Sequence, residues 1–280
     1  MATKKSNVTE RDNPDLLKGK HVVTGDVKAI RASLSKPANL QMFSVWLVGI
    51  TPLLVHAWAE KGKKAMLAKH TKAVKAGGKE TRDPYGEFVS TLYPMTSKSL
   101  VDEDGMLIPG LSYGFPVTGV KNSILTAAHK DKGIPKNAVR SALWLDAEMV
   151  RVAPALAGAI CDMPLVRIWG SEPEMREDMV RVGAGLNKTA SMAYRAQFTY
   201  WAMRLTGHYN PDIIPDETLI FLLQEAGTGD GLGEWRVSRS GVFGSYKVAN
   251  DAEAKAWDDF AAGDGKGRVP TPFGELRAAA

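Results

Sequence analysis

A glycine-rich stretch between residues 227 and 244 has the residue types and spacing best suited to ligand binding. Its glycines are Gly227, Gly229, Gly231, Gly233, Gly241 and Gly244. Glycine lets the backbone adopt positive φ and approach a ligand closely, and successive exposed N–H groups can form a concave anion site. Arg236 and Arg239 add cations, and Trp235 offers a ring on which a base can stack. The structural alternative is a helix C-cap followed by a tight turn, which also uses glycine.

A lysine-rich segment between residues 61 and 79 is the second candidate for binding, because it holds seven lysines and no acid. They are Lys61, Lys63, Lys64, Lys69, Lys72, Lys75 and Lys79. Residues 63–76 favour a helix by propensity, and like charges repel one another within such a helix. A polyanion would relieve this repulsion, although a solvated insertion fits the same residues. Lys121 and Arg195 are further candidates for phosphate contacts.

Histidines are the residues best suited to metal-independent acid–base catalysis, and His56, His70, His129 and His208 are the candidates. None has a second acid–base group at a spacing that suggests a catalytic pair. His56 lies between Val55 and Ala57, which favours a packed role, and a cation at the end of a helix is favourable without catalysis, as at His129. Zinc, EF-hand, Walker and serine-hydrolase spacings do not occur. We therefore expect no catalytic residue, no metal and no cofactor.

Composition narrows the class of protein. The 280 residues are 44% hydrophobic and 24% charged, as in ordinary globular proteins, and the net charge of +5 permits a polyanionic partner. Cys161 is the single cysteine, so no internal disulfide can form, which suits a reducing compartment. No apolar run is long enough to span a membrane, and the first residues lack a secretory signal pattern. We expect a cytoplasmic protein without a membrane partner.

Alternating strands and helices must position these residues. Strands are predicted at 43–50, 149–152, 165–169, 194–205 and 242–248, and helices at 116–130, 214–226 and 251–260. This order predicts an α+β fold, a ferredoxin-like or RRM-like antiparallel sheet with two core helices on one face. The open face of such a sheet often stacks nucleotides.

Changes in composition along the chain predict its organisation. We expect a flexible N-terminal arm at 1–38, a core at 39–249 with a helical, lysine-rich insertion at 60–105, and a C-terminal tail at 250–280.

The element order and the glycine-rich loop before the last strand resemble the repeat-associated mysterious protein (RAMP) superfamily of CRISPR systems, in particular its backbone subunits. The alternating glycines at Gly227, Gly229, Gly231 and Gly233 carry this resemblance, and residues 48–56 and 231–236 also resemble uncharacterised bacteriophage proteins. The resemblance implies non-catalytic binding of RNA or single-stranded DNA in a basic groove. It also implies a repeating subunit, assembled with copies of itself or other subunits in a bacterial host cell. Two alternatives stay open: a metal-independent endoribonuclease of the same family, and a structural or protein-binding phage component.

Overall fold

A computed structural model of the chain describes residues 39–57, 82–96, 98–131, 134–151, 162–182, 189–271 and 276–277. They belong to one compact unit, Asn39–Ala280. The predicted N-terminal arm at 1–38 lies outside the described residues, and so does the lysine-rich segment 61–79.

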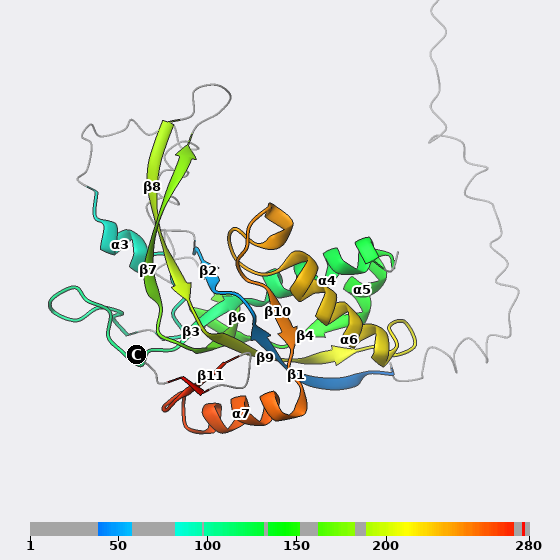
Figure 1. The fold of residues 1–280 in the computed structure, drawn as a ribbon. Helices are drawn as coiled ribbons and strands as arrows, with labels where there is room; N and C mark the ends of the chain where they lie inside the picture. Colours follow the sequence, from blue (N-terminus) through cyan, green and yellow to red (C-terminus); the bar gives the residue numbers. More distant parts are fainter. Residues whose placement is uncertain are drawn as a thin grey trace, which may run out of the picture. The chain divides into compact units, whose positions relative to one another are not determined.

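A seven-stranded sheet forms the centre of the unit Asn39–Ala280 (Figure 1). Its main path runs through β10 (Tyr246–Val248), β1 (Gln41–Gly49), β9 (Trp201–Tyr209), β6 (Asp162–Gly170) and β3 (Tyr113–Pro116). Two short strands extend it, β4 (Leu143–Leu145) beside β9 and β5 (Glu148–Arg151) beside β6. All of these pairings are antiparallel, so the chain is α+β with an antiparallel central sheet.

A second sheet of three strands joins β2 (Leu53–Val55), β8 (Thr189–Phe198) and β7 (Glu174–Val182). The single long strand predicted at 194–205 is wrong, because the chain bends at Thr199–Tyr200 and passes from β8 into β9 of the other sheet. The Ser171 hydroxyl stabilises this bend by accepting hydrogen bonds from both backbone N–H groups, at 3.1 and 3.2 Å. The alternation of apolar and polar residues did not reveal the bend, because β8 and β9 each bury one face.

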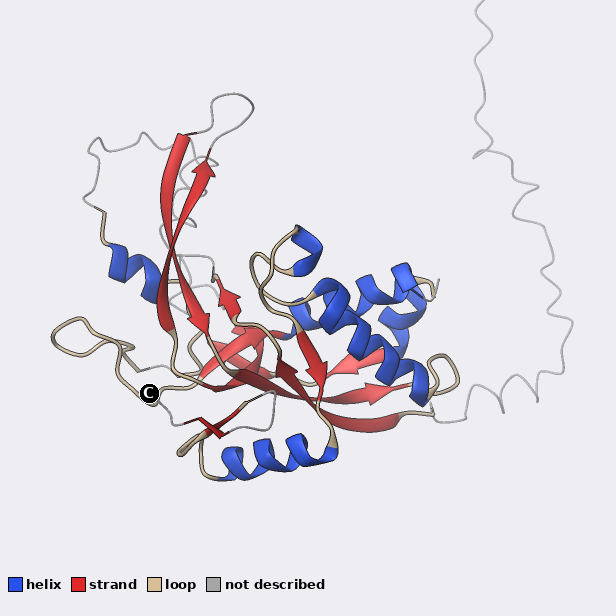
Figure 2. Cartoon of the chain, in the orientation of Figure 1, coloured by secondary structure: helices blue, strands red, loops and turns tan. Residues whose placement is uncertain are grey.

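Two long helices pack on one face of the large sheet, as Figure 2 shows. They are α4 (Val117–Asp131) and α6 (Asp216–Glu225), with the shorter α5 (Lys136–Ala142) beside α4, and they confirm the two predicted core helices. Ile124 of α4 and Leu222 of α6 are fully buried in one cluster with Leu47 and Met203 of the sheet. Leu47 and Met203 face each other across β1 and β9.

The opposite face of the sheet carries α7 (Asp251–Ala262), which confirms the predicted acidic helix. Asn250 and Glu253 form a capping box at its start. Trp257 and Phe260 of this helix bury themselves against Trp46 and other residues of β1 and β9. The predicted C-terminal tail is therefore wrong over these residues, and the face expected to stay open for nucleotides is covered.

The described part of the predicted insertion at 60–105 also belongs to the core. α3 (Pro84–Val89) places Phe88 in the main hydrophobic cluster, and Leu92 follows it there. The predicted strand at 242–248 is reduced to β10, and a two-stranded ribbon of β11 (Val269–Pro270) and β12 (Leu276–Arg277) completes the described elements. Among the described helices, none is long and apolar enough to cross a membrane.

Candidate ligand-binding cleft

The glycine-rich stretch forms a compact loop that backbone hydrogen bonds hold in place. It begins as a π-helical turn, η4 (Ala226–Asp230), and continues through a short 3-10 turn, η5 (Val237–Arg239), toward β10. Its backbone is hydrogen-bonded to the chain around β2: Glu234 donates to Leu54 (3.0 Å) and Gly244 donates to Pro52 (2.8 Å). The loop is therefore fixed against the second sheet.

Close backbone packing explains two of these glycines. Gly233 has φ of +77°, and a Cβ there would lie 2.2 Å from the Leu54 carbonyl oxygen. A Cβ at Gly241 would lie 1.6 Å from the Trp235 carbonyl oxygen. Gly229 differs, because a Cβ there would meet nothing within 4 Å. Close packing of the backbone therefore explains why Gly233 and Gly241 are glycines, without a bound ligand.

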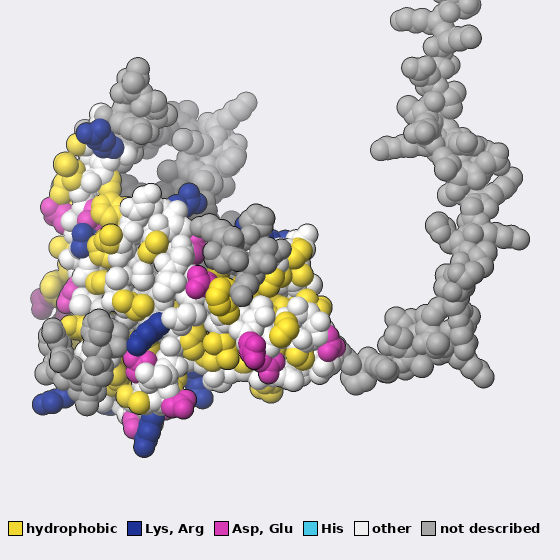
Figure 3. All heavy atoms as spheres, turned by 45° about the vertical axis from the view of Figure 1, so that its right-hand side comes forward, with side chains coloured by type: hydrophobic (Ala, Val, Ile, Leu, Met, Phe, Trp, Pro, Cys, Tyr) yellow, Lys and Arg dark blue, Asp and Glu magenta, His cyan; other side chains and the backbone are white. Residues whose placement is uncertain are grey.

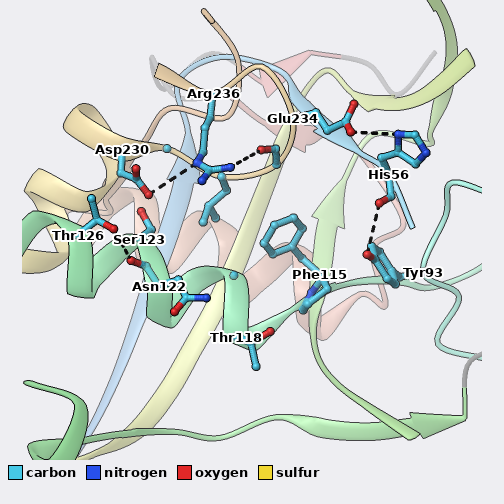
Figure 4. Close-up of a pocket in the computed structure, with 15 residues that line it drawn as sticks. His56, Tyr93, Phe115, Thr118, Asn122, Ser123, Thr126, Asp230, Glu234 and Arg236 are labelled. Atoms are coloured by element: carbon cyan, nitrogen blue, oxygen red, sulfur yellow. Dashed lines mark hydrogen bonds and ion pairs between the residues drawn. The ribbon is translucent and has the colours of Figure 1, made fainter. Parts of the chain in front are cut away.

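A cleft of about 380 Å³ lies between this loop and the amino-terminal half of α4 (Figure 4). This volume falls within the range of small-ligand sites. The lining residues are His56, Tyr93, Phe115, Pro116, Thr118, Gly119, Asn122, Ser123, Thr126, Asp230, Gly231, Leu232, Gly233, Glu234 and Arg236. Hydrogen-bonding side chains from α4 thus face the loop across the cleft.

One wall of the cleft holds a row of charged side chains that continues into the second sheet. His56 Nδ1 lies 3.1 Å from a Glu234 carboxylate oxygen, and Arg195 donates to the other oxygen. Arg195 pairs in turn with Asp178 at 3.2 Å, and its side chain is only 8% exposed. Burial raises the pKa of Glu234, but the hydrogen bonds from His56 and Arg195 outweigh it and lower the pKa to about 2. Glu234 is therefore ionised at neutral pH.

The sequence did not reveal the pair of His56 and Glu234, because the two residues lie far apart in the chain. When Nδ1–H donates to the carboxylate, the neutral imidazole keeps Nε2 as a proton acceptor. Tyr93 lies beside the pair, and its hydroxyl donates to the His56 carbonyl oxygen at 3.4 Å. Burial, aided by the charge of Glu234, raises the pKa of Tyr93, so its hydroxyl stays protonated at neutral pH. In this wall of the cleft, His56 Nε2 can therefore accept a proton, and the Tyr93 hydroxyl holds one.

The glycine-rich loop also contributes Arg236 and Asp230 to the cleft. Arg236 Nε lies 3.7 Å from an Asp230 oxygen and donates to Ser238 Oγ at 3.1 Å. Nη1 of the same guanidinium donates to the Gly233 carbonyl oxygen at 3.3 Å. These contacts orient the guanidinium within the cleft.

The predicted site residues fall into separate groups. Gly231, Gly233 and Arg236 line the cleft together, whereas Gly229 and Arg239 are exposed outside its lining. Trp235 is partly exposed, with its ring near Arg195 and Phe243. Lys61, Lys63, Lys64, Lys69, Lys72 and Lys75 lie outside the described residues.

Arg195 and Lys121, which were predicted to contact phosphate, instead bind other groups of the protein. Arg195 is buried between two carboxylates. Lys121 Nζ donates to the carbonyl oxygens of Leu143 (2.7 Å) and Arg140 (3.2 Å), and burial lowers its pKa. In their observed positions, neither cation is free to meet a phosphate.

The described charges do not form a basic groove. Arg236 and His56 line the cleft together with Asp230 and Glu234, so opposite charges balance there. On the face that Figure 3 shows, lysine and arginine side chains are scattered among acidic ones rather than gathered in a patch. Polar side chains with both signs of charge therefore line the cleft.

Within the described ranges, no three His, Cys, Asp or Glu side chains are placed to bind a metal ion. No protein-family model matches this sequence, and no curated protein matches it.

Proposed function

We propose that this protein binds single-stranded nucleic acid, either RNA or DNA, and that the cleft takes one nucleotide of the strand. The observation that carries the proposal is the composition of the cleft. It combines the guanidinium of Arg236, hydrogen-bonding side chains such as Thr118 and Asn122, and the ring of Phe115. Single strands are bound by such combinations of cation, polar edge contacts and aromatic rings.

The strand order supports a ferredoxin-like core. β1, α4, β6, β9, α6 and β10 follow one another as βαββαβ, and the four strands lie side by side in the order β10-β1-β9-β6. The β7–β8 hairpin and α7 are additions to this plan. Because α7 covers the face that would stack bases in an RRM-like protein, we place the strand at the cleft instead.

The resemblance to RAMP backbone subunits supports a non-catalytic role for the bound strand. In this proposal the protein is a repeating subunit of a nucleoprotein assembly in the bacterial cytoplasm. The seven lysines at 61–79 would supply contacts to phosphates that need no particular base sequence.

Titration of a fluorescently labelled 20-nucleotide strand, as RNA and as DNA, tests this proposal. We expect the logarithm of the association constant to fall linearly with the logarithm of salt concentration, since bound phosphates release counterions. Arg236→Ala should weaken binding about tenfold, which is the effect of losing one charge-assisted contact. Arg268→Ala is the matched control, because Arg268 is exposed and lies outside the cleft lining. Absence of binding at low salt would overturn the proposal.

The pair of His56 and Glu234 favours a second candidate, metal-independent RNA cleavage. Nε2 of His56 would take the proton from a ribose 2′-OH, and the 2′ oxygen would attack the adjacent phosphorus. The bond to the 5′ oxygen would break, that oxygen would take a proton from water as it leaves, and Arg236 would balance the phosphate charge.

RNA incubated with the protein in excess chelator tests this candidate. Cleavage that requires a 2′-OH at the scissile nucleotide and is lost in His56→Ala would support it. An intact strand, or cleavage that persists in His56→Ala, would rule out this site as a nuclease centre.

A further inference from the structure

Asp230 is the most buried charged group that lines the cleft, with its side chain 7% exposed. Its charged contact among the described residues is with Arg236, at 3.7 Å, which is beyond hydrogen-bonding distance. Within the same set of residues, no group donates a hydrogen bond to this carboxylate. Buried polar groups are normally hydrogen-bonded, so donors from a bound molecule would complete the surroundings of Asp230.

The neighbours of Asp230 restrict what that molecule is. Nε and Nη1 of Arg236 have acceptors in the protein, and Nη2 has none among the described residues. Ser123 also lines the cleft, where its hydroxyl donates to the Ala226 carbonyl oxygen at 3.1 Å. The two carboxylate oxygens of Asp230 can accept hydrogen bonds, and the guanidinium of Arg236 can donate them. The two groups lie side by side in the cleft, as Figure 4 shows.

We propose that the cleft recognises a guanine base. Guanine has two adjacent donors, N1–H and the N2 amino group, followed by the O6 acceptor on the same edge. Asp230 would accept from the two donors, and Arg236 would donate to O6. Adenine, cytosine and uracil each have only one donor group on that edge, so none of them satisfies both oxygens of Asp230.

The chemistry of the carboxylate favours a base over a phosphate at this position. A buried anion repels phosphate, whereas it is a strong acceptor for the polarised N–H groups of guanine. The ring of Phe115 lines the same cleft and can contact the base plane. This inference depends on the proposed function, since it assigns a base preference to the same cleft.

Oligouridine 12-mers that carry one central guanosine, inosine, adenosine or cytidine test the inference with the unmodified protein. We expect guanosine to bind about 5- to 150-fold more tightly than adenosine or cytidine, the range for one bidentate base contact. Inosine lacks the N2 amino group and should fall between them. Equal affinities would overturn the guanine inference and leave strand binding intact, whereas no binding to any oligomer would overturn both.

Free GMP and AMP, added as competitors, separate the two sources of the base. Displacement of the guanosine oligomer by GMP and not by AMP, at similar concentrations of GMP and oligomer, would assign the cleft to a free guanine nucleotide. Displacement that needs GMP in large excess supports a guanine within a strand.

Asp230→Asn tests the role of the carboxylate directly. An asparagine amide offers one acceptor and one donor, the pattern that suits adenine. We expect the preference for guanosine over adenosine to fall to about twofold or to reverse. Asp259→Asn is the matched control, because Asp259 is exposed on α7. A correctly folded Asp230→Asn protein, judged by circular dichroism, that keeps the full guanine preference would overturn the inference. The inosine measurement decides the matter if the variant does not fold.

Discussion

The two faces of the large sheet differ in what they leave accessible. Under α7, the rings of Trp46 and Trp257 lie with centroids 6.0 Å apart and both residues are buried. On the other face, the apolar core beneath α4 and α6 gives way to a polar cleft at the glycine-rich loop. The aromatic surface suited to stacking bases is therefore closed, and the accessible surface is one of hydrogen-bonding groups. A cluster of aromatic residues does not by itself show where a nucleotide binds.

Trp257→Ala should cause the greatest loss of stability among the variants of the two faces. Removing a buried tryptophan that packs on Trp46 and Phe260 should lower the free energy of unfolding by about 3–5 kcal/mol. Urea denaturation measures the loss. Trp257→Phe should cost less, because it keeps a ring and removes an indole N–H that has no described acceptor.

The folded fraction of Trp257→Ala should bind a single strand as the parent protein does, because the cleft lies on the other side of the sheet. If uncovering Trp46 and Trp169 changed the affinity by tenfold or more, the site would belong to the α7 face. The comparison between the two faces would then be reversed.

Arg195→Ala should have the next largest effect, about 3 kcal/mol of unfolding free energy. The change leaves Asp178 buried with Arg176 as its remaining cation, at 2.9 Å, and removes one of the two partners of Glu234. Arg181→Ala, on the exposed part of the same hairpin, should change stability by less than about 0.5 kcal/mol. Equal effects of the two variants in thermal denaturation would show that the buried row of charges is unimportant to the fold.

Local patterns in the sequence predicted the two long core helices, α4 and α6, but not α3, α5 and β3, which also place residues in the core. The helical spacing of Val120 and Ile124 predicted α4, and the apolar run from Leu219 to Leu223 predicted α6. The same rule failed at Thr199–Tyr200, where alternation continues across a bend between two sheets. It also failed to show that Trp257 packs against Trp46, since a helix pattern does not reveal which surface it covers.

The candidate site could be predicted only in part. Its glycine-rich side was visible because the glycines cluster in the sequence. His56 and Glu234 meet only through the folding of β2 against the loop, and no local pattern predicts that contact. Arg195 could not be recognised as buried, because the sequence of β8 does not show that Asp178 and Glu234 approach it from two sides.

Glu234→Gln tests whether the ionised carboxylate in the cleft wall stabilises the fold. The folded pKa of about 2 lies below the ordinary value of 4.5, so the ionised carboxylate stabilises the fold fully above pH 4.5. That contribution is lost as pH falls from 4.5 toward 2. We expect the variant to be less stable by about 1–3 kcal/mol at pH 7 and nearly equal to the parent at pH 2. Urea midpoints at pH 7, 5, 3 and 2 measure this, and a difference independent of pH would contradict it.

Gly229→Ala should have the smallest effect on stability and most directly separates packing from ligand approach. A Cβ at Gly229 meets nothing within 4 Å, so alanine should change the unfolding free energy by about 0 to +1 kcal/mol through a less flexible unfolded chain. Gly233→Ala is the contrasting variant, because its Cβ would collide with the Leu54 carbonyl oxygen and force the loop away from β2. Since Gly229 lies outside the cleft lining, strand affinity should stay unchanged in Gly229→Ala and fall in Gly233→Ala. A loss of affinity in a fully stable Gly229→Ala protein would place the strand along the outer side of η4, and the cleft would then be only part of the binding surface.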